Sequence, residues 1–279
     1  MTTISPRLPR LVVALVALVG TSCATLTGSS TAPTHRALVI GIDRYSIDAD
    51  PTILEARGLR DLRGAVRDAT TMADVLRARG YAVRTLTDEQ ATRAALLDAV
   101  DRHLVTPTRP GDDVVFFFAG HGSKLPTGDR REVDGQDETL VPVDATRGVP
   151  DLRDDTLRRR LRPILDRGGR LTVILDACYS GAATRGLPPE RRTRSAAPPR
   201  FVASLIPTTE PTSLLERGDL EAGDTLILAA AQDHQEAHET DGPTPRGVFT
   251  EALLRALGSA APDEDAATTL RRAATRMAS

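Results

Sequence analysis

Several short stretches of the chain are apolar at nearly every position, which is typical of strands buried on both faces. Such stretches lie at Arg36–Asp43, Asp112–Gly120, Leu171–Ala177 and Asp224–Ala231, and a further strand is predicted at Tyr81–Thr87. Between them, apolar residues recur at helical spacing in Leu62–Gly80, 91–104, Asp155–Asp166 and 247–257. This alternation predicts an α/β fold with a mainly parallel central sheet that is covered by helices on both faces.

In parallel sheets of this kind, ligands and chemistry gather beyond the carboxyl ends of the strands. Two strand ends therefore become the places to look for a site, namely Gly120–Ser123 and Cys178–Gly181.

The first 23 residues have the layout of an export signal, because two arginines precede a short apolar run from Leu11 to Val19 and small residues follow. The run is shorter than the roughly 20 residues that span a bilayer. Cys23 follows Gly-Thr-Ser as at a bacterial lipoprotein processing site, although Gly20 stands where a large aliphatic residue is usual. We expect an exported protein of the cell envelope, lipid-anchored through Cys23; the alternatives are secretion after cleavage at Ala24, or the cytoplasm if the signal is spurious.

The remaining chain divides by composition. Residues 24–35 are rich in Ser, Thr, Gly and Ala and are predicted to be a flexible linker, followed by one folded domain over residues 36–258. Within it, residues 181–217 are rich in Arg and Pro, and a loop of that length in a compact domain is usually functional or disordered. Residues 259–279 are predicted to be a weakly structured C-terminal tail.

Composition narrows the function classes. A chain of 279 residues with 40% hydrophobic content can bury a sizeable core, and its net charge of −2 gives no bulk attraction to nucleic acid or to a membrane surface. An aromatic content of 3% without tryptophan disfavours base-stacking surfaces. We therefore expect no nucleic-acid partner, and membrane attachment only through a lipidated N-terminus.

Two residues with complementary chemistry stand at the two strand ends. His121 follows one strand in FFFAGHGS, and Cys178 follows another in VILDACYSG. A thiol is a weak nucleophile until it is ionised, and a nearby imidazole can take its proton. A catalytic Cys-His dyad therefore explains the placement of both residues. The backbone amides of Gly122 and Cys178 are candidates to stabilise a developing oxyanion.

Structural and metal-binding interpretations of these residues are the alternatives. A lone histidine in a loop is often a capping residue, and a lone cysteine at a strand end is often a small core residue. A zinc site would need further ligands at metal spacing, and no convincing set is supplied by the remaining histidines, His35, His103, His234 and His238, which we assign to solvated or structural roles.

Six motifs cover roughly Arg36 to Leu257, namely RALVIGID, L-GAVRDA, FFFAGHGS, DGQDETLVPVD, DACYSG and GVFTEALL. Together they resemble the caspase-like cysteine peptidases, specifically the metacaspase branch of peptidase family C14. The resemblance implies a caspase-type α/β/α sandwich, with His121 as general base and Cys178 as nucleophile for peptide-bond hydrolysis, and it implies no cofactor for that chemistry.

The acid beside the nucleophile suggests a specificity. Asp176 lies two residues before Cys178 and on the same side of the strand, where its carboxylate would pair with a basic residue before the scissile bond, the P1 residue. The resemblance makes Asp68 a second acid of the S1 pocket, which receives P1; the alternative for Asp68 is a solvated carboxylate on a helix. We therefore predict protein or peptide substrates cut after Arg or Lys.

The resemblance carries two further expectations. The large and small subunits of the family are separated by self-cleavage in the loop after the cysteine, where the candidate P1 residues are Arg185, Arg191, Arg192, Arg194 and Arg200; the alternative is an uncut, disordered insertion. Calcium is a possible activator with Asp137, Asp154 and Asp155 as its ligands, but Arg185 stands where the family often has another Asp.

Two functions of different class follow. The first is an endopeptidase that cuts after basic residues, and the second is a catalytically weak caspase-like binding or signalling module of the cell envelope. Ala119 motivates the second, because metacaspases commonly have Ser at this position.

Overall fold

The computed structural model describes residues 34–126, 136–178, 194, 196, 225–230, 237–240 and 242–258, which belong to one unit, Pro33–Ser279. Several predicted features lie outside the described residues, namely the export signal with Cys23, the tail 259–279, His234, most of the loop 181–217, and Arg185, Arg191, Arg192 and Arg200.

The central sheet has five strands in the order β2-β1-β3-β7-β8 among the described residues. Its strands are β1 (His35–Gly41), β2 (Tyr81–Thr87), β3 (Asp113–Ala119), β7 (Arg170–Asp176) and β8 (Thr225–Ala229), and all four neighbouring pairs are parallel. The three consecutive phenylalanines of β3, Phe116–Phe118, are fully buried, as expected for a strand that is covered on both faces. The prediction of an α/β fold with a mainly parallel sheet is confirmed.

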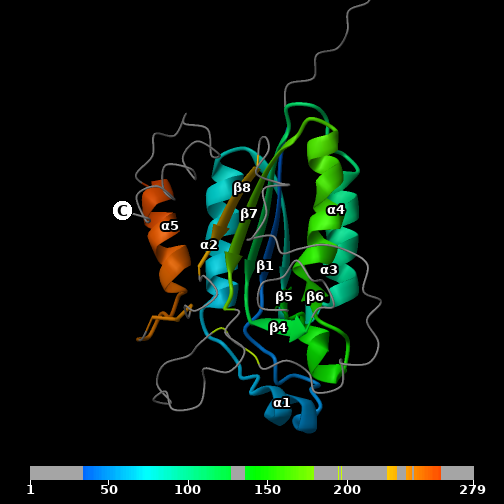
Figure 1. Ribbon diagram of the computed structural model, residues 1–279. Coiled ribbons are helices and arrows are strands. Elements are labelled where there is room, and N and C mark those ends of the chain that lie inside the picture. Colours follow the sequence, from blue (N-terminus) through cyan, green and yellow to red (C-terminus); the bar gives the residue numbers. More distant parts are fainter. Residues whose placement is uncertain are drawn as a thin grey trace, which may run out of the picture. The chain divides into compact units, whose positions relative to one another are not determined.

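Helices cover both faces of this sheet. Figure 1 shows α2 (Ala65–Ala78) and α5 (Val248–Gly258) on one side, with α3 (Arg93–Ala99) and α4 (Asp154–Asp166) on the other. The helix expected over residues 91–104 is divided, because α3 passes at Val100 into a π-helical segment, η2 (Val100–Val105). His103 in that segment lies with Nε2 3.1 Å from the Ala37 carbonyl and 3.0 Å from the Ala82 carbonyl, a structural role.

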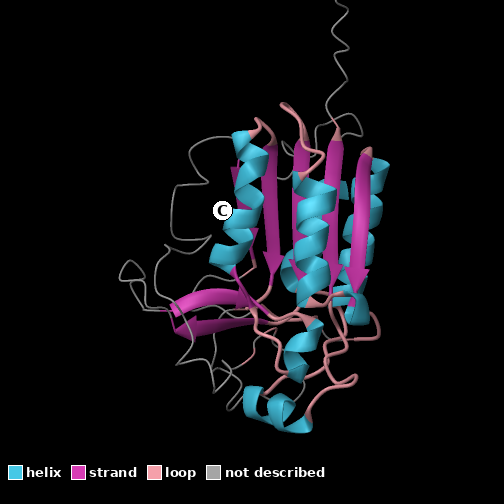
Figure 2. Ribbon diagram, turned by 90° about the vertical axis from the view of Figure 1, so that its right-hand side faces the viewer, coloured by secondary structure: helices cyan, strands magenta, loops and turns pink. Residues whose placement is uncertain are grey.

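A second, antiparallel sheet lies beyond the carboxyl ends of the central strands (Figures 1 and 2). It consists of β4 (Gly122–Pro126), β5 (Gln136–Leu140) and β6 (Leu152–Arg153). The remaining elements are the short helix α1 (Pro51–Arg57) and the 3-10 turns η1 (Asp88–Gln90) and η3 (Val143–Arg147). This sheet was not predicted, since its strands are short and mix charged with apolar residues.

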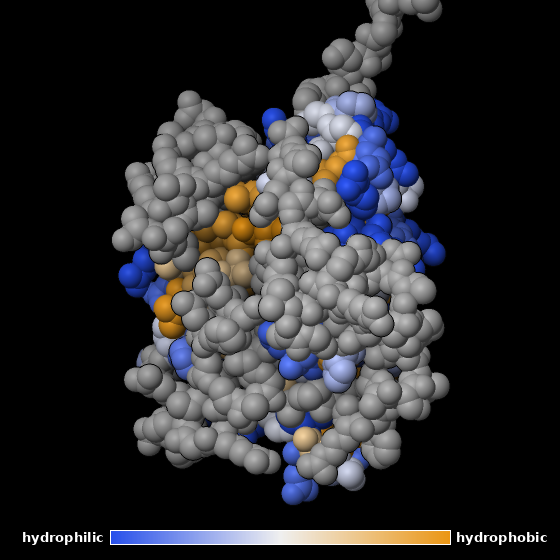
Figure 3. All heavy atoms as spheres, in the orientation of Figure 1, coloured by the Kyte–Doolittle hydropathy of each residue, from blue (hydrophilic) through white to orange (hydrophobic). Residues whose placement is uncertain are grey.

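Strand β8 is the outermost described strand on its side, and its residues except Leu228 are only half-buried. Figure 3 shows apolar residues at the surface in the region where β8 lies in Figure 1. No helix in the described part of the chain is long and apolar enough to span a bilayer.

Candidate active site

Neighbouring strands bring His121 and Cys178 to the same edge of the sheet. Ala119 at the end of β3 pairs in register with Asp176 at the end of β7, and each chemical residue lies two positions further on. The Gly120 amide still donates to the Asp176 carbonyl at 3.3 Å, so the pairing persists past the strand ends. Both side chains are buried.

The His121 imidazole is held in one tautomer. Its Nε2 lies 2.7 Å from the carbonyl oxygen of Arg60, which can only accept a hydrogen bond, so Nε2 carries the proton and Nδ1 carries the lone pair. Among the described residues, Nδ1 has no hydrogen-bond partner within ordinary bonding geometry. Burial lowers the pKa of His121 to about 4, with the positive charges of Arg194 and Arg57 acting in the same direction against the Arg60 hydrogen bond. The imidazole is therefore neutral at pH 7 and can accept a proton at Nδ1.

Tyr45 fixes the backbone and the ring of the histidine. Its hydroxyl accepts from the His121 amide at 3.0 Å and donates to the Val141 carbonyl at 3.1 Å. The two rings lie 4.6 Å apart between centroids. Gly120 is required beside them, because a Cβ there would approach the Tyr45 hydroxyl to 2.8 Å.

The side chain of Cys178 is fully buried. Its thiol donates to the Ala237 carbonyl at 3.2 Å and accepts from the Ala237 amide. Ala237 thus brings a segment from the C-terminal part of the chain against the thiol.

Two backbone amides converge on one oxygen. The Gly122 amide donates to the Arg194 carbonyl at 2.9 Å, and the Cys178 amide donates to the same oxygen at 3.1 Å. These are the two amides predicted to stabilise an oxyanion. Two further backbone hydrogen bonds lie next to this oxygen in the sequence. The Arg194 amide donates to the Ala237 carbonyl at 3.2 Å, and the Ala196 amide donates to the Gly122 carbonyl at 2.9 Å. Arg194 and Ala196 are therefore each held by backbone hydrogen bonds to the residues around the thiol.

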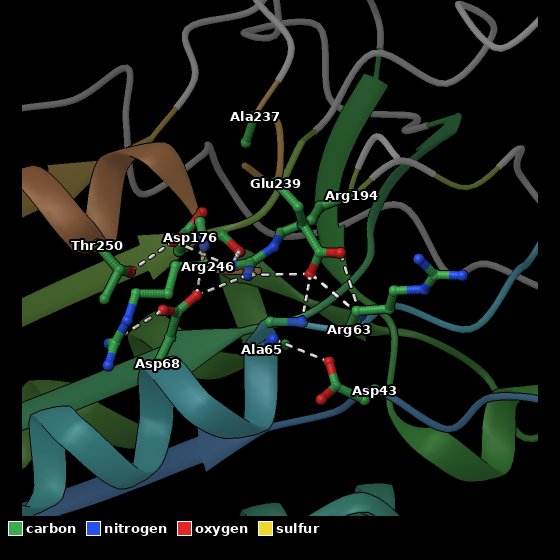
Figure 4. A network of polar contacts seen from close by, with 12 residues as sticks. Asp43, Arg63, Ala65, Asp68, Asp176, Arg194, Ala237, Glu239, Arg246 and Thr250 are labelled. Carbon is green, nitrogen blue, oxygen red and sulfur yellow. Dashed lines mark hydrogen bonds and ion pairs between the residues drawn. The ribbon is translucent and has the colours of Figure 1, made fainter. Parts of the chain in front are cut away.

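The Arg194 side chain is fully buried among three carboxylates (Figure 4). Its Nη2 lies 2.7 Å from Asp68 and 3.3 Å from Glu239, and its Nη1 lies 2.9 Å from Asp176. Burial by itself lowers the pKa of Arg194, but the surrounding carboxylates hold it above its ordinary value. Asp68 and Asp176, both predicted for this pocket, thus lie together around one cation, and Asp68 is buried rather than solvated.

The carboxyl of Asp68 is itself perturbed. Burial raises its pKa to about 7, Asp176 acts in the same direction, and Arg194 acts against both. Its Oδ2 also accepts from the Gly247 amide at 2.7 Å. Asp68 therefore changes charge near neutral pH even with a guanidinium beside it.

The C-terminal part of the chain completes the pocket in ways that the sequence did not indicate. The Thr250 hydroxyl donates to Asp176, and Gly247 passes so close that a Cβ there would lie 2.1 Å from Oδ2 of that residue. Glu239 was not among the predicted site residues, although it contacts both the Arg194 guanidinium and the start of α2. Thr250 and the Arg60 carbonyl gave no signal, since nothing local marks either as part of a site.

The three residues proposed as calcium ligands do not form a ligand group. Asp137 forms an ion pair with Arg153, and Asp155 pairs with Arg158 at 2.8 Å, while Asp154 accepts the Asp155 amide at 2.7 Å. Within the described residues, no three His, Cys, Asp or Glu side chains gather as a metal site. The donor set does not fit a calcium ion, because arginines already neutralise two of the three carboxylates.

Taken together, the edge of the sheet holds a neutral imidazole, a thiol, two converging amides and three carboxylates around a buried guanidinium. Such a set can take a proton from a thiol, stabilise negative charge on a carbonyl oxygen and bind a cationic side chain.

Comparison with known proteins agrees with this arrangement. Residues 34–279 match the caspase domain family. Metacaspase-1A of Aspergillus niger is 35% identical over 159 residues, and metacaspase-1B of Aspergillus fumigatus is 37% identical over 162 residues. Each match covers 53% of this chain and 36% of the relative, so the matched region is about a third of the length of these relatives.

A solved structure extends the likeness to most of the fold. The crystal structure of a Geobacter sulfurreducens protein superposes with a TM-score of 0.60 and 26% identity, covering 88% of this chain and 89% of that one. Since the family match spans nearly all of the chain beyond residue 33, the chain belongs to the caspase domain family of peptidase family C14.

Proposed function

We propose that this protein is a cysteine endopeptidase that cuts peptide bonds after basic residues, with Cys178 as nucleophile and His121 as general base. One observation carries the proposal. Arg194 has its side chain among three carboxylates while its carbonyl oxygen accepts from the Gly122 and Cys178 amides. That is the position that a P1 arginine and its scissile carbonyl would take, and relatives named metacaspases support the reaction class.

The chemistry follows from the geometry. His121 Nδ1 takes the thiol proton, the thiolate adds to the scissile carbonyl, and the charge that develops on oxygen is met by the two amides. The proton passes to the departing amine, and water then hydrolyses the thioester. The Cys178 thiol is hydrogen-bonded to Ala237, and His121 Nδ1 has no partner in the described part of the chain. The first proton transfer therefore needs a rotation of the thiol or one bridging water.

A test of the reaction compares the wild type with Cys178→Ala and His121→Ala on a fluorogenic peptide that ends in arginine. Turnover should fall by at least about a thousandfold in both variants, because removing either member of such a dyad removes the activated nucleophile. Equal turnover in the wild type and Cys178→Ala would overturn the peptidase proposal.

The proposal includes self-processing in the loop 181–217, with the bond after Arg194 as the site. Of the five candidate arginines, Arg194 is the one that lies in the described residues, and its contacts are those of a bound P1 residue. Until that bond is cut, the same contacts keep an external basic residue out of the pocket. Intact-mass analysis should find a fragment that begins at Ser195 in the wild type and not in Cys178→Ala.

Arg194→Gln should remove that fragment, and Arg200→Gln is the matched control in the same loop. Cleavage that continues after residue 194 in Arg194→Gln, or identical fragments in the wild type and Cys178→Ala, would contradict self-processing at this bond.

A binding or signalling module remains the second candidate. The arrangement that favours it is the thiol held on Ala237 with the cleft filled by the chain itself. This candidate predicts no Cys178-dependent turnover while an arginine ligand still binds once Arg194 is replaced by Ala.

Export to the cell envelope with a lipid on Cys23 is also part of the proposal, and its support is the sequence layout of residues 1–23. Fusion of residues 1–40 to a reporter should direct it out of the cytoplasm, and Cys23→Ser should release it from the membrane fraction. A reporter that stays in the cytoplasm would contradict export.

A further inference from the structure

We infer that Glu239 makes the S1 pocket selective for arginine over lysine, an inference that rests on the proposed peptidase function. Asp68 and Asp176 alone would accept any cation. Glu239 adds a third carboxylate from a distant part of the chain. A guanidinium, with its two terminal nitrogens, can contact this carboxylate together with the other two.

Glu239 is fixed in position by the start of α2. Its carboxylate accepts from the Gly64 amide at 2.8 Å and from the Arg63 amide at 3.0 Å (Figure 4). Gly64 caps α2, so the carboxylate lies at the positive end of a 14-residue helix. The backbone of Glu239 also forms an isolated bridge with Gly247. The side chain is therefore anchored to the fold and does not depend on the cation for its position.

The two ends of the guanidinium reach different acids. Nη1 contacts the Asp176 carboxylate at 2.9 Å and the carbonyl of the same residue at 3.3 Å. Nη2 contacts Asp68 at 2.7 Å and Glu239 at 3.3 Å. One arginine thus joins the acid of β7 to the two acids at the α2 end of the pocket.

A lysine offers a single nitrogen in place of this planar fork. An ammonium close to Asp176 leaves Glu239 without its charge partner. An ammonium close to Glu239 leaves Asp176 with the Thr250 hydroxyl as its one other side-chain partner among the described residues. Because the pocket is buried, a carboxylate without a cation is costly there. A P1 lysine therefore gains less from Glu239 than a P1 arginine does.

The test is the Glu239→Gln variant measured on two peptides that differ only in Arg or Lys at P1. Glutamine keeps the shape and an oxygen that can accept from Arg63 and Gly64, but it removes the charge. We expect kcat/KM for the arginine peptide to fall about tenfold, the scale of one charge-assisted hydrogen bond, with little change for the lysine peptide. Glu251→Gln is the matched control, because Glu251 pairs on the surface with Arg255.

An equal loss on both peptides would overturn the inference, because it would mean that Glu239 acts only through the structure of the pocket. An unchanged ratio of the two kcat/KM values would also overturn it. Wild-type protein that cuts neither peptide, with no difference from Cys178→Ala, is instead the failure of the proposed function.

Binding gives a readout that needs no turnover. Titration calorimetry of N-acetyl-arginine amide and N-acetyl-lysine amide would use Cys178→Ala with Arg194→Ala, so that the pocket is empty and uncut. The arginine amide should bind more tightly, and adding Glu239→Gln should remove most of that preference. Glu239→Asp, whose shorter side chain retreats from the cation, should reduce the preference in part; a preference unchanged in both variants contradicts the inference.

Discussion

Asp68, which we assign to the proposed S1 pocket, changes its charge near neutral pH. Its pKa is raised to about 7 by burial, whereas that of His121 is lowered to about 4, so the two groups titrate in separate ranges. The histidine is already neutral and basic at pH 6, but Asp68 is still largely protonated there. Binding of a basic P1 residue should therefore limit activity at mildly acidic pH.

The first prediction concerns the pH profile. For an arginine peptide, kcat/KM should rise as pH passes through the pKa of Asp68 in the pocket without Arg194, because the charged carboxylate attracts the guanidinium. The Arg194 guanidinium lowers that pKa to about 7, so the rise should lie above pH 7 once Arg194 has left. Asp68→Asn should lower kcat/KM on the alkaline side of this rise and remove the rise itself. A rise above pH 7 that survives in Asp68→Asn would show that another group causes it.

The second prediction concerns Gly247. An alanine Cβ at this position would lie 2.1 Å from Asp176 Oδ2 and 2.9 Å from Arg194 Nη1, so the pocket would have to shift. Gly247→Ala should reduce kcat/KM for an arginine peptide about a hundredfold, the scale of a misplacement of about 1 Å in an active site. Gly258→Ala is the control, since a Cβ there meets nothing within 4 Å. Equal loss in both variants would contradict the argument.

At the scale of elements, β5 and β6 are joined by a charge pair where the family resemblance suggested calcium. Asp137 lies on β5 and its partner Arg153 on β6, and the pair links neighbouring strands of the second sheet. The positive charge that a bound ion would supply is thus already part of the chain.

The third prediction follows from this pair. Turnover should be the same in a calcium chelator and in millimolar calcium, because Arg153 and Arg158 neutralise Asp137 and Asp155. Turnover of an arginine peptide, measured after removal of metals and again after adding calcium, checks this. A calcium-dependent increase that is lost in Asp137→Asn would show that the ion displaces the arginine.

The elements that could be predicted from the sequence are those whose pattern is dictated by burial. The run Val114–Phe118 is apolar throughout because β3 has covered faces on both sides, and α2 is amphipathic because it covers one of them. The second sheet escaped prediction, since Lys124 and Glu138 face each other in register across β4 and β5 and give no apolar alternation.

In the candidate site, too, the residues that could be predicted are those whose position is dictated by buried strands. The positions of His121, Cys178 and Asp176 could be predicted, because the first two follow buried strands and the third ends one, and the ends of neighbouring parallel strands meet at one edge of the sheet. Glu239 could not be assigned a role, because it reaches the pocket through hydrogen bonds to amides 175 and 176 residues away in the sequence. No local pattern records such a contact.

At the scale of the whole molecule, the proposed cut after Arg194 would divide a single sheet. Strand β8 follows the cut in sequence but pairs along β7, which precedes it, and α5 packs against α2. Thr250 and Glu239 also bind groups from the N-terminal part. The two pieces therefore share one core.

The fourth prediction is that the cut protein stays together. Size-exclusion chromatography of self-processed protein should give one species with the retention of intact Cys178→Ala, because separating the pieces would expose the buried face of β7 to water. The same sample should give two separate species in denaturant. Dissociation under native conditions would contradict the shared core.

Because the Gly122 and Cys178 amides converge on one oxygen, an inhibitor that places a negatively charged or hydroxyl oxygen there should bind tightly. A peptide aldehyde that ends in arginine would add the Cys178 thiol reversibly, and the oxygen of the resulting hemithioacetal would take the two hydrogen bonds that the Arg194 carbonyl now accepts. As a mimic of the transition state it should bind at least about a hundredfold more tightly than the matching amide. Because Arg194 must first leave the pocket, inhibition should set in slowly in uncut protein and at once in Arg194→Ala, so the rate of onset would report how often the cleft opens.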